Sequence, residues 1–374
     1  MGGGTPAKRR YVDYWHSLNQ ILNIFAAGLT FGVFGPALMD LAEIYSSKEN
    51  DIALTNSMRA LGTLAGSIIG GYFYKFMNDQ ICMFIVILLY ALSTVLTPVF
   101  SSLWILHVLA FVGGFVVGVF EIGSQVRLVR AWLEQSAAAL QAFHTAFGVG
   151  AMLAPFVAAP FLSSVEDGVR VKETQLWIPF GIFGVVFLLI LLSMLGAYIV
   201  DPVGIHDSKK VEVKETGSSR KTFENLLVSL LFLYILFTVN TEITYSSLFS
   251  VFAVKSPDLQ FSKSMGAYLA GVFWTTFTVG RLLSIFAAML VDIPTLLYIS
   301  HAMLLAASGL MVAFESSALC VWLGTALLGL GISSLYGAAS GYCFQYFTVR
   351  HFHVSVILVS PVMVSRIHGA RAAA

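Results

Sequence analysis

Four polar side chains stand out in one apolar, glycine-rich stretch of the chain, residues 112–155. The carboxylate of Glu121 can take up and release a proton, while the imidazole of His144 and the amides of Gln125 and Gln141 can hydrogen-bond hydroxyl groups. A carboxylate at the centre of a membrane helix costs about 2.5–3.5 kcal/mol on insertion scales. If this stretch spans a membrane, Glu121 therefore needs a partner, a solute or a proton.

The spacing of these four residues places them at one level of two consecutive helices. At about 1.5 Å per residue, Glu121 lies about 9 Å and His144 about 12 Å from the same end of their helices. Gln125 follows Glu121 by four positions and His144 follows Gln141 by three, so each pair shares a helix face. We interpret the four as half of a solute site. The alternative is that Glu121 and His144 only hold two helices together.

The composition requires that the helices carrying these residues lie in a membrane. Of 374 residues, 57% are hydrophobic and 11% are charged, and the mean hydropathy is +0.83, which is far too apolar for a soluble globular protein. The net charge of +1 and the lack of a basic stripe argue against nucleic acid as a partner.

Several kinds of chemistry lack the residues they need. No nucleotide-binding or hydrolytic motif occurs, so we expect neither enzyme activity nor a cofactor. The cysteines Cys82, Cys320 and Cys343 are scattered through apolar segments and predict neither disulfides nor a metal site.

Stretches of about 20 apolar residues predict ten membrane helices. Their approximate ranges are 15–41, 52–74, 81–100, 104–126, 137–162, 177–200, 223–254, 265–290, 294–314 and 319–342. Glycines at small-xxx-small spacings, such as Gly62, Gly66, Gly114 and Gly118, predict close helix packing rather than phosphate loops. We therefore expect an all-α polytopic membrane protein.

Charged loops set the orientation of these helices and divide them into two groups. Basic residues recur in alternate loops, on the side that also holds residues 1–14, which predicts a cytoplasmic N-terminus. Six helices in 15–200 are followed by a polar connector, 201–222, and by four clear helices in 223–342. This two-half plan is common in secondary transporters, whose solute sites lie between the repeats.

The last segment, residues 343–374, departs from this plan. Its apolar run, 354–364, is interrupted by Pro361 and is too short to predict a spanning helix. A second half that matched the first would bring the total to twelve helices. The sequence therefore indicates an atypical tail that is truncated or altered.

A second group of polar residues lies in the second half. Glu242 and Tyr245 fall on its first predicted helix, and Trp274 and Arg281 fall on the next. The depths of Glu242 and Arg281 allow an ion pair, which would either lock the two helices together or open as a gate. Tyr245 and Trp274 are candidate solute contacts.

Three further polar residues lie near the start of the chain. Asp40, at the end of the first predicted helix, and Arg59, in the second, could form another ion pair, for which we favour a structural role. Asn23 is the residue of the first helix that lies deep enough to contact a solute.

Six segments carry a resemblance to a known family. They are GPALMDLA at 35–42, SMRALGTLAGSIIGG at 57–71, FEIGSQV at 120–126, LQAFHTAFGVGAMLAP at 140–155, NTEITYSSLF at 240–249 and FWTTFTVGRLLSI at 273–285. Through them, residues 18–342 resemble the major facilitator superfamily, within it the sodium-dependent glucose transporter 1-like branch, and more distantly the bacterial fucose permease. The resemblance implies a two-half bundle of twelve helices.

The resemblance also implies roles for single residues. Glu121 falls where the branch carries an acid proposed for cation-coupled sugar binding, and Glu242 falls on the acid of its helix-seven motif. Gln125 and Ile122 stand where Asn and Thr are usual, which leaves the solute and the coupling ion open. After the second helix, Lys75 replaces the acid of the loop signature G-x-x-x-D, so the contact made there must differ or be lost.

Together, these features predict a secondary transporter of a hexose-like solute, glucose or a related sugar, that works by alternating access and is coupled to sodium or protons. The coupling groups would be Glu121 and Glu242, the gates or ion pairs would involve Asp40, Arg59 and Arg281, and the solute contacts would be Asn23, Gln125, Gln141, His144, Tyr245 and Trp274. The expected partners are the solute and the lipid bilayer, with the protein as a monomer in the plasma membrane. Two alternatives remain open: a short form that acts as a partner or sensor without transporting, and a carrier of a nucleoside, polyol or organic acid.

Overall fold

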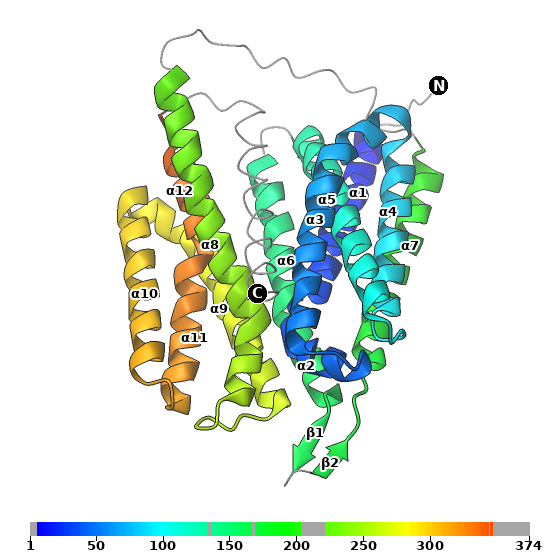
Figure 1. Ribbon diagram of the computed structural model, residues 1–374. Helices are drawn as coiled ribbons and strands as arrows, with labels where there is room; N and C mark the ends of the chain where they lie inside the picture. The colour runs from blue at the N-terminus through cyan, green and yellow to red at the C-terminus, as the bar shows by residue number, and fades with distance from the viewer. Residues whose placement is uncertain (1–5, 133–135, 167–168, 203–220, 344, 347–374) are drawn as a thin grey trace. The chain divides into compact units, whose positions relative to one another are not determined.

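The computed structural model describes residues 6–132, 136–166, 169–202, 221–343 and 345–346, and most of them are helical (Figure 1). The helices are α1 (Pro6–Gly32), α2 (Phe34–Ile44), α3 (Glu49–Phe76), α4 (Asp79–Leu96), α5 (Leu103–Trp132), α6 (Ser136–Ala158), α7 (Trp177–Val200), α8 (Lys221–Lys255), α9 (Lys263–Leu290), α10 (Ile293–Ala313), α11 (Ala318–Ser333) and α12 (Leu335–Cys343), with a short 3-10 helix, η2 (Ala159–Phe161).

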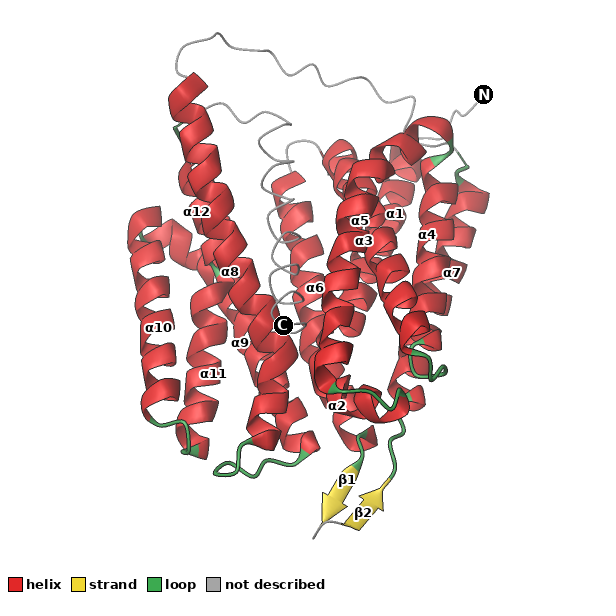
Figure 2. Ribbon diagram, in the orientation of Figure 1, coloured by secondary structure: helices red, strands yellow, loops and turns green. Residues whose placement is uncertain are grey.

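One small hairpin is the exception to the helical fold (Figure 2). Strands β1 (Ser164–Glu166) and β2 (Val169–Lys172) pair in antiparallel fashion in the loop between α6 and α7. The sequence did not predict this hairpin, because its residues are charged and few. Apart from it, the described residues bear out a mostly helical fold.

The first predicted helix, 15–41, is two helices that meet at a bend of 55°. Pro36 lies in the first turn of α2 and cannot donate a backbone hydrogen bond to the Gly32 carbonyl four residues earlier, which its ring also crowds. α1 therefore ends at Gly32, and the chain turns at Val33 before α2 begins.

The predicted count of ten membrane helices is not confirmed. Among the described residues, eight helices are long and apolar enough to span a membrane, or nine if α1 and α2 form one span, with α11 and α12 counted together. The remaining predicted span corresponds to α3, which is 28 residues long but too polar on average, with Asn56, Ser57 and Arg59 in its sequence. Residues 347–374, most of the predicted tail, lie outside the described residues.

Contacts divide the chain into two compact units. Unit 1 holds α1, the end of α2, α3 to α5, α6 as far as Ala154, and α7. Unit 2 holds α8 to α12 and also two segments from the first half of the sequence, Gly32–Met39 and Pro155–Glu173. The start of α2 and the end of α6 therefore pack with helices of the second half. The predicted connector, 201–222, lies almost wholly outside the described residues.

Glycines bring α3 and α5 of unit 1 into backbone contact. A Cβ atom on Gly114 of α5 would overlap the backbone carbonyl of Arg59 on α3, and one on Gly118 would overlap the same helix. Gly62 and Gly66 of α3 lie equally close to the backbone of α5. These glycines are therefore packing positions, as predicted, because helices in apolar surroundings associate by close backbone approach.

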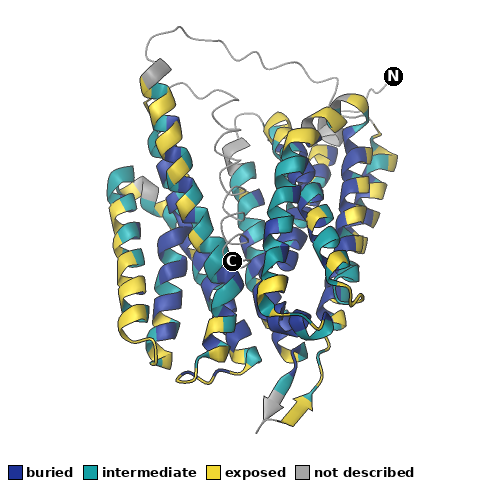
Figure 3. Cartoon of the chain, in the orientation of Figure 1, coloured by how far each residue is buried: buried dark blue, intermediate teal, exposed yellow. Residues whose placement is uncertain are grey.

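The distribution of exposed residues suits a membrane (Figure 3). Many exposed side chains are large and apolar; in α10, for example, Leu305 and Val312 are 75% and 78% exposed. A surface of this kind on long helices is stable in hydrocarbon rather than in water. The chain is accordingly an integral membrane protein that crosses the bilayer several times.

Candidate solute and ion-coupling sites

Glu121 and His144 lie at similar heights on α5 and α6. The residues just before them, Phe120 and Phe143, are fully buried in the core of unit 1, and their ring centroids are 6.1 Å apart. Glu121 and His144 are the next residues of the two helices, so they lie close to the height of this ring contact. The His144 ring also packs edge-on against Phe143, with centroids 5.4 Å apart.

The four polar residues singled out on α5 and α6 are partly exposed. Glu121, Gln125, Gln141 and His144 each keep an intermediate share of their surface accessible. A site that binds and releases a solute needs side chains that remain accessible. Their binding role stays a prediction.

A tyrosine that the sequence did not single out lies near Glu121. The Tyr90 hydroxyl of α4 hydrogen-bonds the Thr30 hydroxyl of α1 and is within electrostatic range of both Glu121 and Arg59. Four helices of unit 1 thus contribute to one polar cluster. Tyr90 escaped the sequence analysis because a single tyrosine in an apolar run has the pattern of an ordinary core residue.

Asp40 and Arg59 lie in unit 1, and their ion pair stays a prediction. Asp40 is fully buried at the end of α2. The Arg59 guanidinium lies over the Phe31 ring, 5.7 Å from its centroid, which is within the range of a cation–π contact.

Asn23 differs from the other predicted solute contacts of unit 1 because it is sealed in the interior. Its exposed fraction is 0%, and its Nδ2 donates a hydrogen bond of 3.3 Å to Met194 Sδ on α7. A solute could reach Asn23 only after α1 and α7 move apart.

Tyr245 and Trp274 belong to an aromatic cluster in unit 2. The Tyr245 ring stacks on Phe249 with centroids 4.2 Å apart, and its hydroxyl hydrogen-bonds Thr325 of α11. Tyr245 and Phe249 also lie where α8 packs against α9. Trp274 is 1% exposed and packs edge-on against two phenylalanine rings of α9. Both residues therefore have structural partners in this unit.

Glu242 of α8 and Arg281 of α9 interact electrostatically within unit 2. The Arg281 guanidinium lies over the Phe277 ring, 4.5 Å from its centroid, in cation–π geometry. Glu242 is partly exposed on α8. The electrostatic interaction joins opposite charges from two neighbouring helices, and their role as a gate stays a prediction.

With this arrangement described, comparison with known proteins identifies the family. Residues 21–362 match the family model described as Major Facilitator Superfamily. The chain belongs to the major facilitator superfamily. The human sodium-dependent glucose transporter 1 is 26% identical over 350 residues, which cover 86% of this chain and 66% of that protein. The mouse sodium-dependent glucose transporter 1A is 28% identical over 343 residues, which cover 86% of this chain and 80% of the relative. The chain thus spans just under two thirds of the length of the human relative.

The fold of this superfamily member is also found among solved transporter structures. The crystal structure of a D-xylose–proton symporter matches with a TM-score of 0.72 at 12% identity, covering 96% of this chain and 89% of that one. Identity this low establishes the fold alone. Family and fold together are those of transporters rather than enzymes.

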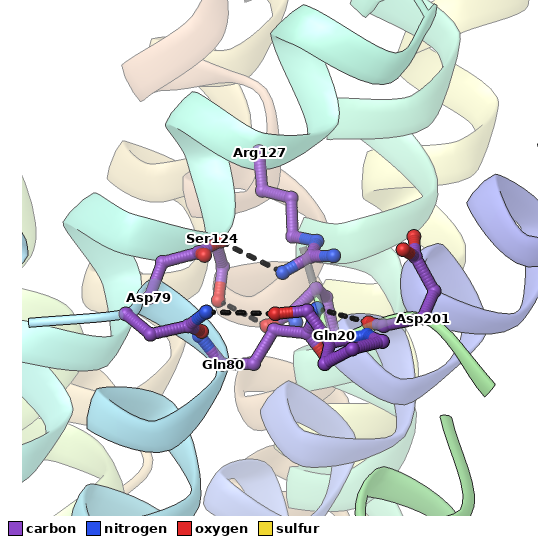
Figure 4. Close-up of polar contacts among 8 residues, drawn as sticks. Gln20, Asp79, Gln80, Ser124, Arg127 and Asp201 are labelled. Atoms are coloured by element: carbon purple, nitrogen blue, oxygen red, sulfur yellow. Dashed lines mark hydrogen bonds and ion pairs between the residues drawn. The ribbon is translucent and has the colours of Figure 1, made fainter. Parts of the chain in front are cut away.

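One feature of this superfamily member was missed by the sequence analysis: a buried ion pair at the end of unit 1 where α4 begins and α5 ends (Figure 4). The Arg127 guanidinium of α5 donates to the Asp79 carboxylate at 2.8 Å. Asp79 lies four residues after Lys75, which stands at the acid position of the loop signature, and it pairs with Arg127. An aspartate at the first position of a helix is favoured by the helix dipole, which is the signal that could have found it.

Two hydrogen bonds of residues close to this pair in the sequence link α4 and α5 to further helices. Gln80 Nε2 donates to the Asp201 carbonyl, just after α7, at 2.7 Å, and Ser124 Oγ of α5 donates to Gln20 Oε1 of α1, also at 2.7 Å. Together with the Asp79–Arg127 pair, these bonds tie α1, α4, α5 and α7 at one end of unit 1 (Figure 4).

Proposed function

We propose that this protein is a secondary transporter that moves a hexose-like solute by alternating access, coupled to sodium or protons. Glu121 is the principal coupling group and Glu242 the second. The partly exposed side chains of Gln125, Gln141 and His144 make the first contacts with the solute, and Asn23, Tyr245 and Trp274 join them when the helices rearrange.

The proposal rests mainly on the surroundings of Glu121. This residue is a partly exposed carboxylate in an apolar, glycine-rich helix, at the height of His144 on the neighbouring helix and one turn from Gln125. A carboxylate in such surroundings is stabilised when a cation or a proton neutralises it. Binding of the ion and binding of a solute beside it are then coupled, because each favours the other.

The solute class is supported by the chemistry of the neighbouring side chains. Gln125 and Gln141 each offer both donors and acceptors, and His144 offers one of each in its neutral form. Hydroxyl groups of a sugar need such mixed partners. The names of the relatives that are 26% and 28% identical, sodium-dependent glucose transporters, agree with this chemistry.

Uptake into proteoliposomes tests the proposal. We expect the purified protein to concentrate a labelled hexose when a sodium or a proton gradient is imposed, and Glu121→Gln to exchange the hexose without concentrating it. Glu315→Gln is the matched control, because Glu315 is exposed in the loop after α10. If Glu121→Gln concentrates the hexose normally, the coupling role is wrong. If no hexose enters the vesicles under either gradient, the proposed solute class is wrong.

We also propose a location in the plasma membrane with the N-terminus and the 201–222 connector in the cytoplasm. Basic residues recur in the alternate loops that are predicted to lie on the same side of the membrane as the N-terminus, and an excess of basic residues marks cytoplasmic loops. Protease cleavage of an epitope tag at the N-terminus only after the cells are permeabilised would support this orientation; cleavage in intact cells would contradict it.

A further inference from the structure

A stripe of three polar residues runs along one face of α1 and contacts α7. His16, Asn19 and Asn23 are spaced by three and four positions and therefore share a helix face. They are 6%, 1% and 0% exposed. Asn19 Oδ1 accepts a hydrogen bond of 2.7 Å from Ser193 Oγ, and Asn23 Nδ2 donates to Met194 Sδ, so these two residues of the stripe lie in the interface with α7.

Each of these side chains has one buried polar atom without a hydrogen-bond partner among the described residues. These atoms are His16 Nε2, Asn19 Nδ2 and Asn23 Oδ1. Buried polar atoms in native proteins are nearly always paired, with protein or with ordered water, so three such atoms on one face point to bound partners there.

The neighbouring contacts settle which way the two amides are turned. Ser193 Oγ accepts from Trp15 Nε1 at 2.9 Å and donates to Asn19 Oδ1 at 2.7 Å. This leaves Asn19 Nδ2 as the free donor. Met194 Sδ can only accept, which directs Asn23 Nδ2 towards it and leaves Asn23 Oδ1 as the free acceptor.

We propose that the interface between α1 and α7 is a binding site for internal water, with one molecule bridging Asn19 Nδ2 and Asn23 Oδ1 and a second at His16 Nε2. Four residues of helix rise about 6 Å, close to the length of two hydrogen bonds of about 2.9 Å in series. Water suits this site because it accepts from the amide N–H and donates to the amide oxygen. A cation suits it less, since the Asn19 amide hydrogens face it and the Arg127 charge acts on His16.

The site concerns the hydration of the α1–α7 interface in the arrangement described here, in which Asn23 is fully buried; the solute contact proposed for Asn23 forms only when the helices rearrange. The site also explains why α1 carries a polar stripe in the interior of a membrane protein. Each of the three atoms would be costly to leave unpaired in a dry interface, whereas the two water molecules pair all of them.

X-ray radiolytic footprinting in ¹⁸O-labelled water tests the proposal on the purified full chain in detergent. Radicals formed from bound water oxidise the side chains beside it, so Met194, which contacts Asn23, reports on the site. Met83 is the control, because it is 1% exposed in the same core. We expect Met194 to gain labelled oxygen several-fold faster than Met83. Equal rates for the two methionines would overturn the proposal.

Two variants distinguish bound water from bulk solvent, since Met194 is itself 8% exposed. Asn23→Leu removes the free acceptor and Asn19→Leu removes the free donor, each with a side chain of similar branching. In either variant that elutes as a single folded species, we expect oxidation of Met194 to fall to the rate of Met83. Unchanged fast oxidation of Met194 in both variants would show that bulk solvent reaches it and would refute the site. If neither variant folds, equal oxidation rates of the two methionines in the unaltered protein would still overturn the proposal.

Discussion

Arg127 on α5 and Asp79 at the first position of α4 form an ion pair of 2.8 Å in which each side chain is only 9% exposed. Both charges are largely withdrawn from water, so each depends on the other to offset its loss of hydration. The pair joins residues that are 48 positions apart in the sequence. It therefore holds α4 against α5 at one end of unit 1.

Removing one partner of this pair should be more harmful than removing both. Asp79→Leu or Arg127→Met leaves a buried charge uncompensated and should cost about 3–5 kcal/mol of unfolding free energy, whereas the double variant should recover much of that loss. Denaturant unfolding in detergent measures the three variants. Arg170→Met is the control, because the Arg170–Glu173 pair is 44% and 75% exposed and such pairs contribute little. If Asp79→Leu costs no more than the control, the pair is not structurally important.

Gly114 on α5 should not tolerate even a methyl group. A Cβ atom there would overlap the backbone carbonyl of Arg59, so Gly114→Ala must push α3 and α5 apart, at a cost of about 1–3 kcal/mol or more. Gly181 of α7 has nothing within 4 Å of its Cβ position, and Gly181→Ala should be neutral or stabilise the helix by up to about 1 kcal/mol. Thermal unfolding of the two variants gives the comparison. Equal melting temperatures would contradict close contact between α3 and α5.

Cross-linking η2, which directly follows α6, to α9 should stop transport if the proposed function holds. Ser264 Oγ of α9 donates to the Ala159 carbonyl of η2 at 3.0 Å, although the two residues lie in different halves of the sequence. Alternating access requires such contacts to break. In a chain whose native cysteines are replaced, Ala159→Cys with Ser264→Cys should lose hexose uptake on oxidation and regain it on reduction.

Ser264→Cys alone is the control for that experiment. It should respond to neither treatment. Full uptake in the doubly substituted protein, with the cross-link verified by mass spectrometry, would show that this contact persists throughout the cycle.

Tyr45 should make stability fall at alkaline pH. Its hydroxyl, just after α2, donates to the Thr97 carbonyl at 2.6 Å, and burial raises the pKa of Tyr45 from 10.0 to about 12. Because the folded pKa is the higher one, the stabilisation is fully present below pH 10 and is lost as the pH rises towards 12. Tyr45→Phe should lose about 0.5–1.5 kcal/mol at neutral pH and should then show a shallower alkaline decline.

The measurement is the unfolding free energy as a function of pH, from about pH 8 to about pH 12, for the unaltered protein, Tyr45→Phe and Tyr11→Phe. Tyr11 is 66% exposed, so its removal should leave the alkaline profile unchanged. Identical slopes for all three proteins would mean that Tyr45 ionises as freely in the folded state as in the unfolded one.

Features that depend on residues close together in the sequence could be predicted from it. Apolar runs predicted the helices because each helix satisfies its own backbone, and glycine spacing predicted the contact of α3 with α5. Pro36 is a local sign of the bend between α1 and α2, although the length of the apolar run predicts a single helix there. α3 was counted as a span although its polar residues lower its hydropathy.

The candidate site was only half predictable. Glu121 and His144 could be placed at one height by counting residues, and the contact of Phe120 with Phe143 agrees with that placement. Tyr90 could not be found, because its importance comes from Thr30 and Glu121 on other helices.

The amino-acid sequence by itself determined that this protein is a helical membrane protein of the major facilitator superfamily, since composition, apolar run length and family motifs are properties of the chain alone. Only the tertiary structure decided which polar residues are accessible and which are sealed. Asn23 and Gln125 are both amide side chains within apolar stretches of the sequence. In the structure, Asn23 is fully buried against α7, whereas Gln125 is partly exposed on α5. The reason is physical: burial and ion pairing depend on what neighbouring helices bring, and Asp79 meets Arg127 only once α4 and α5 pack together.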